Sequence, residues 1–378
     1  MTTLTRAGGP RIWAHAATPA AIDAMREVLM RAQLIEPSLS YVLSTPVSEH
    51  IFDSDVVVLQ EAELQLGLDF LNTMSPDLCL WADDSISTPL FTLSHRLSIP
   101  IILINAKIQQ LWGRRWLWRK TIARQTLRPV SYAFVENTEE TGHLRKLGLP
   151  ARNIEVLGPL LCGAVAPGCD DAERDRIGEI LAGRPVWFAH CVPMQEIRIV
   201  LKAFLQAQRK AHRMLLIFDL AKPTNESDFL KLCDEFDLVT HARAAEGEPE
   251  QRTQVFLTDD DSDTGLWYRL ASLSYMGGSF SVGDVPNPMI AAALGSAVVH
   301  GPKIEKFQHA YARLSETGAT QSLKDEGDLS QRVAAMMEPD QCADMAATGW
   351  QVVSEGAVAT DRLVELALQK LGFGDLHL

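Results

Sequence analysis

The chain has 378 residues, of which 47% are hydrophobic and 22% charged, and its formal net charge at pH 7 is -13. This composition is typical of a soluble globular protein with two domains and excludes a disordered chain. The acidic balance argues against general nucleic-acid binding, which needs a basic face. The N-terminal residues contain no apolar run long enough for a signal peptide or a membrane span, so we expect any contact with a membrane to be made from outside it.

The cysteines are scattered, with no CxxC motif and no ordered partner histidine. They are Cys79, Cys162, Cys169, Cys191, Cys233 and Cys342. This pattern predicts reduced thiols in a cytoplasmic protein, most of them in the core, and neither a zinc site nor a disulfide framework. We expect no metal and no cofactor. The acidic run at 259–263 lacks the spacing of a calcium loop and is interpreted as a solvated loop that leads into a helix.

Apolar strands alternate with amphipathic helices along the chain, a pattern typical of α/β proteins with parallel sheets and helices on both faces. In the first half the predicted strands are 11–15, 39–44, 56–59, 78–81, 101–105 and 132–135. In the second half they are 185–189, 214–218, 236–240, 255–257, 273–276 and 297–300. The sequence therefore predicts two Rossmann-like domains in one chain.

Glycine and proline residues without periodicity mark the junction between these domains, from Gly158 to Gly168. We therefore predict an N-terminal domain at 1–160 and a C-terminal domain at 161–378. The tract 341–371 has helical spacing interrupted only by Gly349 and Gly356, and we expect this closing helix to pack back across the junction.

The segment from Tyr275 to Pro302 reads as a strand, a glycine-rich loop, a capped helix and a second strand. Asn287 is suited to cap the helix and Pro288 to occupy its first position, because the proline nitrogen carries no hydrogen that would be left unpaired. The positive end of that helix would lie at the carboxyl edge of a parallel sheet, where phosphates bind. Ser279, with the backbone of Gly277 and Gly278, is the predicted phosphate contact, and the alternative is a tight turn without a ligand.

Candidate catalytic residues follow two strands of the first half. Asp83 and Asp84 come directly after the predicted strand at 78–81, and His15 ends the first strand. Any of them could act as a general base at the carboxyl edge of the sheet if its environment sets a suitable pKa. The alternatives are a helix cap or a solvated turn for the aspartates and a structural role for the histidine.

The tract 107–128 is basic in an otherwise acidic chain and carries interleaved tryptophans. Cationic side chains would meet anionic head groups or the phosphates of a glycolipid, and indole rings settle at the boundary between head group and acyl chain. The residues assigned to this surface are Lys107, Arg114, Arg115, Trp116, Arg119 and Lys120. A helix with buried tryptophans and solvated arginines is the alternative, and nucleic-acid binding is disfavoured because no stacking or recognition-helix motif accompanies the tract.

Several short blocks in the same order resemble the 3-deoxy-D-manno-octulosonic acid (Kdo) transferases of lipopolysaccharide synthesis. These blocks are Pro76-Asp77-Leu78, 103–107 (LINAK), 135–140 (VENTEE), 265–271 (GLWYRLA), 276–279 (MGGS) and Asn287-Pro288. The resemblance spans nearly the whole chain. It implies a GT-B fold of two facing domains, a CMP-activated sugar acid as donor, a lipid A precursor as acceptor, and inversion at the anomeric carbon. It also implies a peripheral location on the inner face of the cell inner membrane.

The chain departs from this family at polar positions. The family pattern HAxSxGE reads from His15 to Ala21, so the catalytic carboxylate is replaced by Ala21. The glutamate expected three residues after Asn287 is Ile290, and the arginine expected after Asn-Ala is Lys107. Two functions therefore stand: an active Kdo transferase, or a catalytically silent or donor-switched relative that acts as a binding or regulatory module in envelope assembly.

Overall fold

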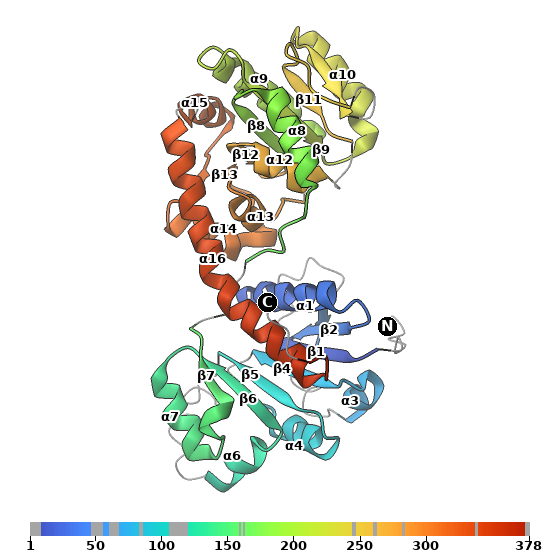
Figure 1. Cartoon of the computed structure of the whole chain (residues 1–378), viewed down its shortest axis with the longest axis vertical. Helices are drawn as coiled ribbons and strands as arrows, with labels where there is room; N and C mark the ends of the chain where they lie inside the picture. The colour runs from blue at the N-terminus through green and yellow to red at the C-terminus, as the bar shows by residue number, and fades with distance from the viewer. Residues whose placement is uncertain are drawn as a thin grey trace. The chain divides into compact units, whose positions relative to one another are not determined.

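The computed structural model describes residues 9–46, 56–59, 68–82, 86–105, 120–158, 160–161, 163–243, 247–259, 263–281, 284–336 and 339–374. The chain forms two compact units, of which unit 1 comprises Met1–Cys162 with Glu355–Leu378 and unit 2 comprises Gly163–Ser354. Each unit has its own parallel sheet with helices on both faces, so the predicted α/β class is confirmed (Figure 1). The boundary between Cys162 and Gly163 lies close to the predicted junction after residue 160. The segment Glu355–Leu378, which we predicted in the C-terminal domain, belongs to unit 1.

Unit 1 contains a seven-stranded parallel sheet in the order β3-β2-β1-β4-β5-β6-β7. Its strands are β1 (Arg11–Ala16), β2 (Ser40–Thr45), β3 (Val56–Val58), β4 (Leu78–Ala82), β5 (Ile101–Ile104), β6 (Val130–Val135) and β7 (Ile154–Val156). Alternate residues of a strand point to opposite faces, and β1 is buried on both. Ile12 and Ala14 pack in one core cluster, and Trp13 packs in the other.

Helices cover both faces of this sheet. They are α1 (Pro19–Ile35), α3 (Leu68–Met74), α4 (Thr88–Arg96), α6 (Lys120–Thr126) and α7 (Thr138–Leu147). Helix α1 begins where the sequence favours a start, because the Thr18 hydroxyl accepts from the Ala21 N–H and Pro19 occupies the first turn. It packs in the same cluster as Ile12, and α4 packs in the cluster of Trp13.

Unit 2 contains a second seven-stranded parallel sheet, in the order β10-β11-β9-β8-β12-β13-β14. Its strands are β8 (Val186–Val192), β9 (Leu215–Leu220), β10 (Thr240–Ala242), β11 (Val255–Leu257), β12 (Leu273–Met276), β13 (Ala297–His300) and β14 (Thr320–Ser322). Strand β8 is central, and the chain later returns to its other side with β12. The crevice between β8 and β12 is therefore the point where strand order reverses, the usual ligand position in open α/β sheets.

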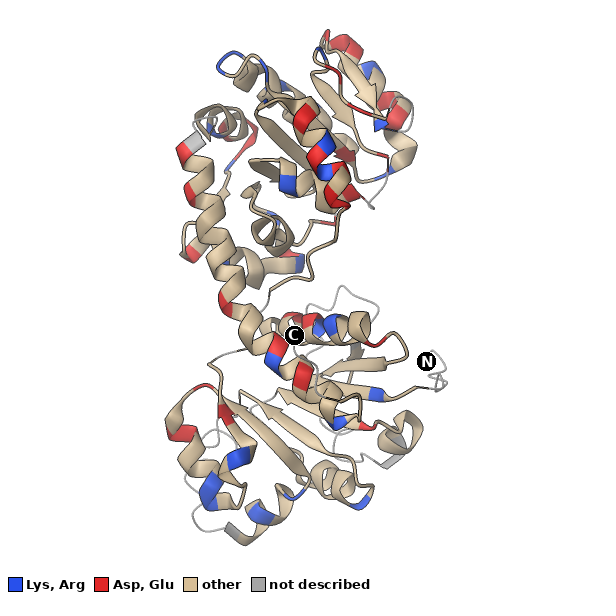
Figure 2. Cartoon of the chain, in the orientation of Figure 1, with Lys and Arg blue, Asp and Glu red and all other residues tan. Residues whose placement is uncertain are grey.

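The helices of unit 2 also lie on both faces of its sheet. They are α8 (Asp171–Leu181), α9 (Met194–Gln208), α10 (Glu226–Glu235), α12 (Thr264–Leu270), α13 (Pro288–Ala293), α14 (Gln308–Glu316) and α15 (Glu326–Met336). Figure 2 shows that charged residues of both units lie mainly on helices and loops, whereas the strands are almost uncharged. This distribution is what sheets buried on both faces require.

The closing helix α16 (Pro339–Lys370) belongs to both units and confirms the predicted return of the C-terminal helix. Leu363 and Val364 are buried in the same cluster as β1 and α1. Two ion pairs fasten this part of the helix, from Arg31 to Asp361 (2.5 Å) and from Arg362 to Glu155 (3.1 Å).

Most predicted strands are present within one or two residues of their predicted ends. The strand predicted at 236–240 begins too early, because α10 ends at Glu235, Asp237 has a left-handed backbone (φ 53°) and β10 runs from Thr240 to Ala242. Strands β7 and β14 were not predicted, because each is only three residues long, is partly exposed and contains polar residues instead of an apolar run.

Candidate functional site

The end of β8 and the glycine loop after β12 meet at the crevice where the strand order of unit 2 reverses. The Gly277 N–H donates to the His190 carbonyl at 2.8 Å. A Cβ atom at Gly277 would lie 2.3 Å from the Cys191 carbonyl oxygen, so the two backbones approach too closely for any side chain. Gly278 follows with φ 78°, a left-handed conformation that glycine adopts without strain.

A buried carboxylate lies inside this glycine loop. Glu196, in the first turn of α9, is 1% exposed. Its Oε2 accepts from the Tyr275 hydroxyl (2.6 Å) and the Gly278 N–H (2.9 Å). Its Oε1 accepts from the Phe280 N–H (2.9 Å) and from the N–H and hydroxyl of Ser281 (2.6 and 2.7 Å). The loop predicted to bind an anion therefore holds one that belongs to the protein.

Ser279 ties the glycine loop to the segment after β13. Its hydroxyl is fully buried, donates to the Met276 carbonyl at 2.5 Å and accepts from the Gly301 N–H at 2.7 Å. The Ser279 carbonyl in turn accepts from the Lys303 N–H at 2.9 Å. The hydroxyl predicted to contact phosphate is thus used within the loop, and a phosphate contact of Ser279 stays a prediction.

Helix α13 begins as the sequence predicts. The Asn287 side chain accepts from the Met289 N–H at 3.0 Å, and Pro288 occupies the first helical position. Burial raises the pKa of the Tyr311 phenol well above its ordinary value, and this neutral hydroxyl donates to the Pro286 carbonyl at 3.0 Å. The contact holds the loop before α13 against α14.

Polar groups from three strands gather at the same edge. The Asp219 carboxylate accepts from the Cys191 N–H (2.8 Å) and from the Thr258 hydroxyl (3.0 Å), and its Oδ2 lies 3.5 Å from Nδ1 of His190. Cys191 has φ 55°, and the pairing of β8 with β9 shifts register at this point. Such a bulge redirects the chain beside a functional edge. His190 and Asp219 were missed by the sequence prediction, although each is a polar residue near the end of an apolar strand.

Two lysines follow β13 on the segment that Ser279 holds. Lys303 is exposed, and Nζ of Lys306 lies 3.4 Å from the Asp284 carboxylate. The carbonyl of Asp284 is 3.6 Å from the Cys191 thiol. Lysines beside a glycine loop are suited to neutralise an anionic ligand, and the sequence prediction overlooked them.

His300, the last residue of β13, is held neutral. Burial lowers the pKa of its imidazole, while a hydrogen bond to the Gly301 carbonyl acts in the opposite direction. Because a carbonyl only accepts, Nδ1 must carry the proton in this 2.6 Å bond. The ring also packs on Tyr311, with centroids 4.5 Å apart.

In unit 1 the structure places His15 in the core. Its side chain is fully buried, stacks on Trp81 with ring centroids 4.3 Å apart, and its Nδ1 is 2.9 Å from the Ser44 hydroxyl. The same hydroxyl accepts from the Trp13 indole at 2.7 Å. The buried imidazole favours the structural alternative, and a role of His15 as a base stays a prediction.

Ala21 lies in the first turn of α1, where the family motif carries its carboxylate. The start of this helix lies beside the end of β4, because the Ala17 N–H donates to the Ala82 carbonyl at 3.1 Å. Several predicted site residues lie outside the described residues, namely Asp83, Asp84, Lys107, Arg114, Arg115, Trp116 and Arg119. Lys120 begins α6, and its side chain is also outside the described part.

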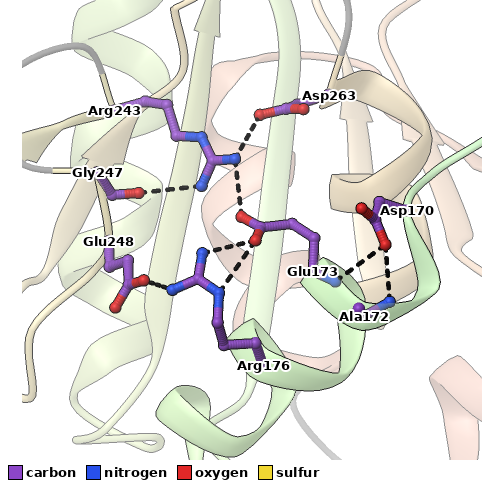
Figure 3. A network of polar contacts seen from close by, with 8 residues as sticks. All are labelled: Asp170, Ala172, Glu173, Arg176, Arg243, Gly247, Glu248 and Asp263. Carbon is purple, nitrogen blue, oxygen red and sulfur yellow. Dashed lines mark hydrogen bonds and ion pairs between the residues drawn. The ribbon is translucent and has the colours of Figure 1, made fainter.

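Asp263, which directly precedes α12, belongs to a network of ion pairs (Figure 3). Arg243 contacts the carboxylates of Asp263 (2.8 Å) and Glu173 (2.9 Å), and Arg176 binds Glu173 (2.6 Å) and Glu248. The arginines hold the pKa of Glu173 below its ordinary value, with the Arg176 hydrogen bond as the largest cause. In the part of the chain that the structure describes, no group of three or more acidic, histidine or cysteine side chains is placed to hold a metal ion.

Two units with parallel sheets, a glycine loop at the strand reversal of the second and a C-terminal helix shared by both are the features of a GT-B-type fold. Residues 2–162 match the family described as 3-deoxy-D-manno-octulosonic-acid transferase (kdotransferase). The chain is therefore a distant homologue of the Kdo transferases, and the match to the family lies in its first half.

Two similar transferases have about one fifth sequence identity to the chain over the aligned residues. The 3-deoxy-D-manno-octulosonic acid transferase of Haemophilus influenzae is 22% identical over 372 residues, which cover 94% of this chain and 86% of the relative. That of Rickettsia bellii is 21% identical, with coverage of 73% and 65%. Among solved structures, the C-terminal CMP-Kdo binding domain of WaaA from Acinetobacter baumannii has 22% identity and a TM-score of 0.46, covering 48% of this chain and 96% of that domain.

No helix within the described residues is both long enough and apolar enough to cross a bilayer.

Proposed function

We propose that the protein transfers Kdo from CMP-Kdo to a lipid A-type acceptor in lipopolysaccharide synthesis, with inversion at the anomeric carbon. The observation that carries this proposal is the similarity to the Haemophilus influenzae transferase, which runs through both units in one alignment. The proposed location is the inner face of the cell inner membrane, with peripheral attachment.

In this proposal unit 2 binds the donor. CMP-Kdo carries a phosphate and a sugar carboxylate, so its site must supply positive charge and hydrogen-bond donors. Lys303 and Lys306 lie on the segment joined to the glycine loop and are the proposed cationic contacts. The loop at Gly277, Gly278 and Ser279 and the start of α13 at Asn287 and Pro288 form the wall of the site.

Unit 1 supplies the base in this proposal. An acceptor hydroxyl must lose its proton as it attacks the anomeric carbon, and a carboxylate within hydrogen-bond reach can take it. Asp83 and Asp84 directly follow β4, whose last residue Ala82 contacts the loop at the start of α1. One of them is proposed to replace the carboxylate missing at Ala21.

The basic tract that ends at α6 is the proposed contact for the acceptor and the membrane. Its residues are Lys107, Arg114, Arg115, Trp116, Arg119 and Lys120. Arginine and lysine would pair with glycolipid phosphates and anionic head groups, and the tryptophans would settle at the interface.

Two positions favour a second function, that of a donor-switched or catalytically silent relative. Ala21 in the first turn of α1 and Ile290 in α13 replace the carboxylates of the family pattern. A protein without both would bind a different nucleotide sugar or act as a silent module in envelope assembly.

Calorimetric titration with CMP, UMP and GMP separates these functions. The Kdo transferase proposal expects binding of CMP in preference to the other two nucleotides. Binding of UMP or GMP with no heat from CMP would replace it with a donor-switched enzyme. A transfer assay with Asp83→Ala and Asp84→Ala then tests the base, because full activity of both variants would remove the aspartates from the reaction.

A further inference from the structure

Backbone N–H groups of the glycine loop after β12 donate to a carboxylate from another part of unit 2. Glu196 lies 82 residues before Gly278 in the sequence, and its two oxygens receive five hydrogen bonds from Tyr275, Gly278, Phe280 and Ser281, each between 2.6 and 2.9 Å. Three of these donors are backbone N–H groups, which together form the kind of concave nest that binds anions in many proteins. A carboxylate offers about four lone-pair positions, so all of them are used here.

A donor phosphate cannot use the same N–H groups while Glu196 occupies them. The carboxylate is 1% exposed, and an anion placed against it would meet a like charge in a poorly solvated environment. The anionic part of a ligand must therefore contact other groups of this edge.

We propose that Glu196 is a positioning residue, the resident anion that holds the loop at 277–281 in the shape required for donor binding. Its effect reaches the ligand through Ser279, whose hydroxyl and carbonyl accept from the Gly301 and Lys303 N–H groups. The loop thereby places the segment that carries Lys303 and Lys306. The link to donor binding rests on the proposed function, whereas the role of Glu196 as the anion of the loop does not.

Chemical rescue tests this role directly. Glu196→Ala leaves an empty nest large enough for a small carboxylate, so sodium acetate should bind there and sodium chloride at equal ionic strength should not replace it. We expect the variant to lose CMP affinity by about tenfold or more, because several charge-assisted hydrogen bonds are removed at once. Acetate should restore most of that affinity and raise the urea midpoint of the variant, with no effect on the wild type.

Three further variants sharpen the experiment. Glu226→Ala removes an exposed glutamate from the first turn of α10, so it controls for charge at a helix start and should change neither quantity. Glu196→Gln fills the space but turns an amide NH₂ toward N–H donors, so it should bind CMP weakly and not respond to acetate. Glu196→Asp keeps the charge and should bind better than the glutamine variant.

The outcomes separate the two proposals. CMP affinity in Glu196→Ala equal to or above that of the wild type would overturn the positioning role, since the ligand would then use the vacated N–H groups. Equal affinity of the glutamine and aspartate variants, or no effect of acetate on the alanine variant, would overturn it as well. If the wild type binds no CMP, the proposed function fails, and the effect of acetate on the urea midpoint still decides whether Glu196 is the resident anion.

Discussion

The carboxyl edges of the two sheets are formed by different kinds of side chain. In unit 2 the edge is built around two buried carboxylates, Glu196 and Asp219, whose oxygens are bound by backbone N–H groups and hydroxyls. In the described part of the unit 1 edge, β1 ends in the buried ring of His15 and in Ala16, and β4 ends in Trp81 and Ala82.

This difference shows which of the two edges needs its atoms in defined positions. Charged hydrogen bonds between distant segments require defined positions, because an unpaired buried carboxylate costs several kcal/mol. Unit 2 therefore has a preset polar edge suited to a charged ligand. Unit 1 has an apolar and aromatic support, and its proposed chemistry depends on the residues that follow β4.

The largest expected effect comes from crowding the contact between β8 and β12. Gly277→Ala would place a methyl group 2.3 Å from the Cys191 carbonyl, so backbone must move. We expect a loss of about 3 kcal/mol or more in the unfolding free energy, measured by urea denaturation. Gly178→Ala in α8 is the matched control, since a Cβ there meets no atom within 4 Å and alanine favours a helix. Equal stability of the two variants would contradict the close approach.

In unit 1 a comparable test removes a single hydroxyl. Ser44→Ala removes the 2.7 Å acceptor of the Trp13 indole and the hydroxyl that lies 2.9 Å from Nδ1 of His15, in a fully buried place. We expect a loss of about 1 to 3 kcal/mol in unfolding free energy and no change in CMP affinity. Ser131→Ala, whose part-buried hydroxyl makes only a 3.3 Å bond, should cost less. A change in nucleotide affinity on Ser44→Ala would link the two edges and break the comparison.

A carboxylate at position 21, where the family motif has one, should increase the stability of unit 1. In Ala21→Glu the new side chain would lie in the first turn of α1, three residues after the Thr18 cap, the spacing of a capping box. Because that turn contains no acidic residue, we expect a gain of about 0.5 kcal/mol in unfolding free energy. Increased Kdo transfer would show that a carboxylate at position 21 acts as the base, and unchanged transfer would favour Asp83 or Asp84.

The smallest effect is a pH dependence in unit 2. Burial lowers the pKa of His300, so in the acidic range below about 6.5 the unfolded chain binds a proton that the folded chain does not. Stability is therefore fully present above this pH and falls as the pH is lowered toward the folded pKa. His300→Phe keeps a ring against Tyr311 and should show a shallower fall in unfolding free energy between about pH 6.5 and 5. Parallel curves for the two proteins would show that His300 contributes nothing to this dependence.

The fold was largely predictable because its signals are local. Apolar runs bounded by glycine and proline marked most strands, and Asn287-Pro288 marked the start of α13. Glu196 carries no such signal, because in the sequence it is an ordinary glutamate near the start of a helix. Its role depends on the pairing of β8 with β12, which brings the distant glycine loop to it. The burial of His15 also depends on its long-range partners, since alternation places it on the face of Trp13 but does not reveal the rings that cover it.

Helix α16 has a consequence for how the gene could be recombined. Unit 1 consists of two separate stretches of chain, and residues such as Leu363 and Val364 complete its core after all of unit 2 has been translated. A single crossover near residue 162 would pair one parent's β1 and α1 with the other parent's C-terminal helix. Exchange of unit 2 between relatives is therefore expected to need two crossovers, one on each side of unit 2, so that the helix and its partners are inherited together.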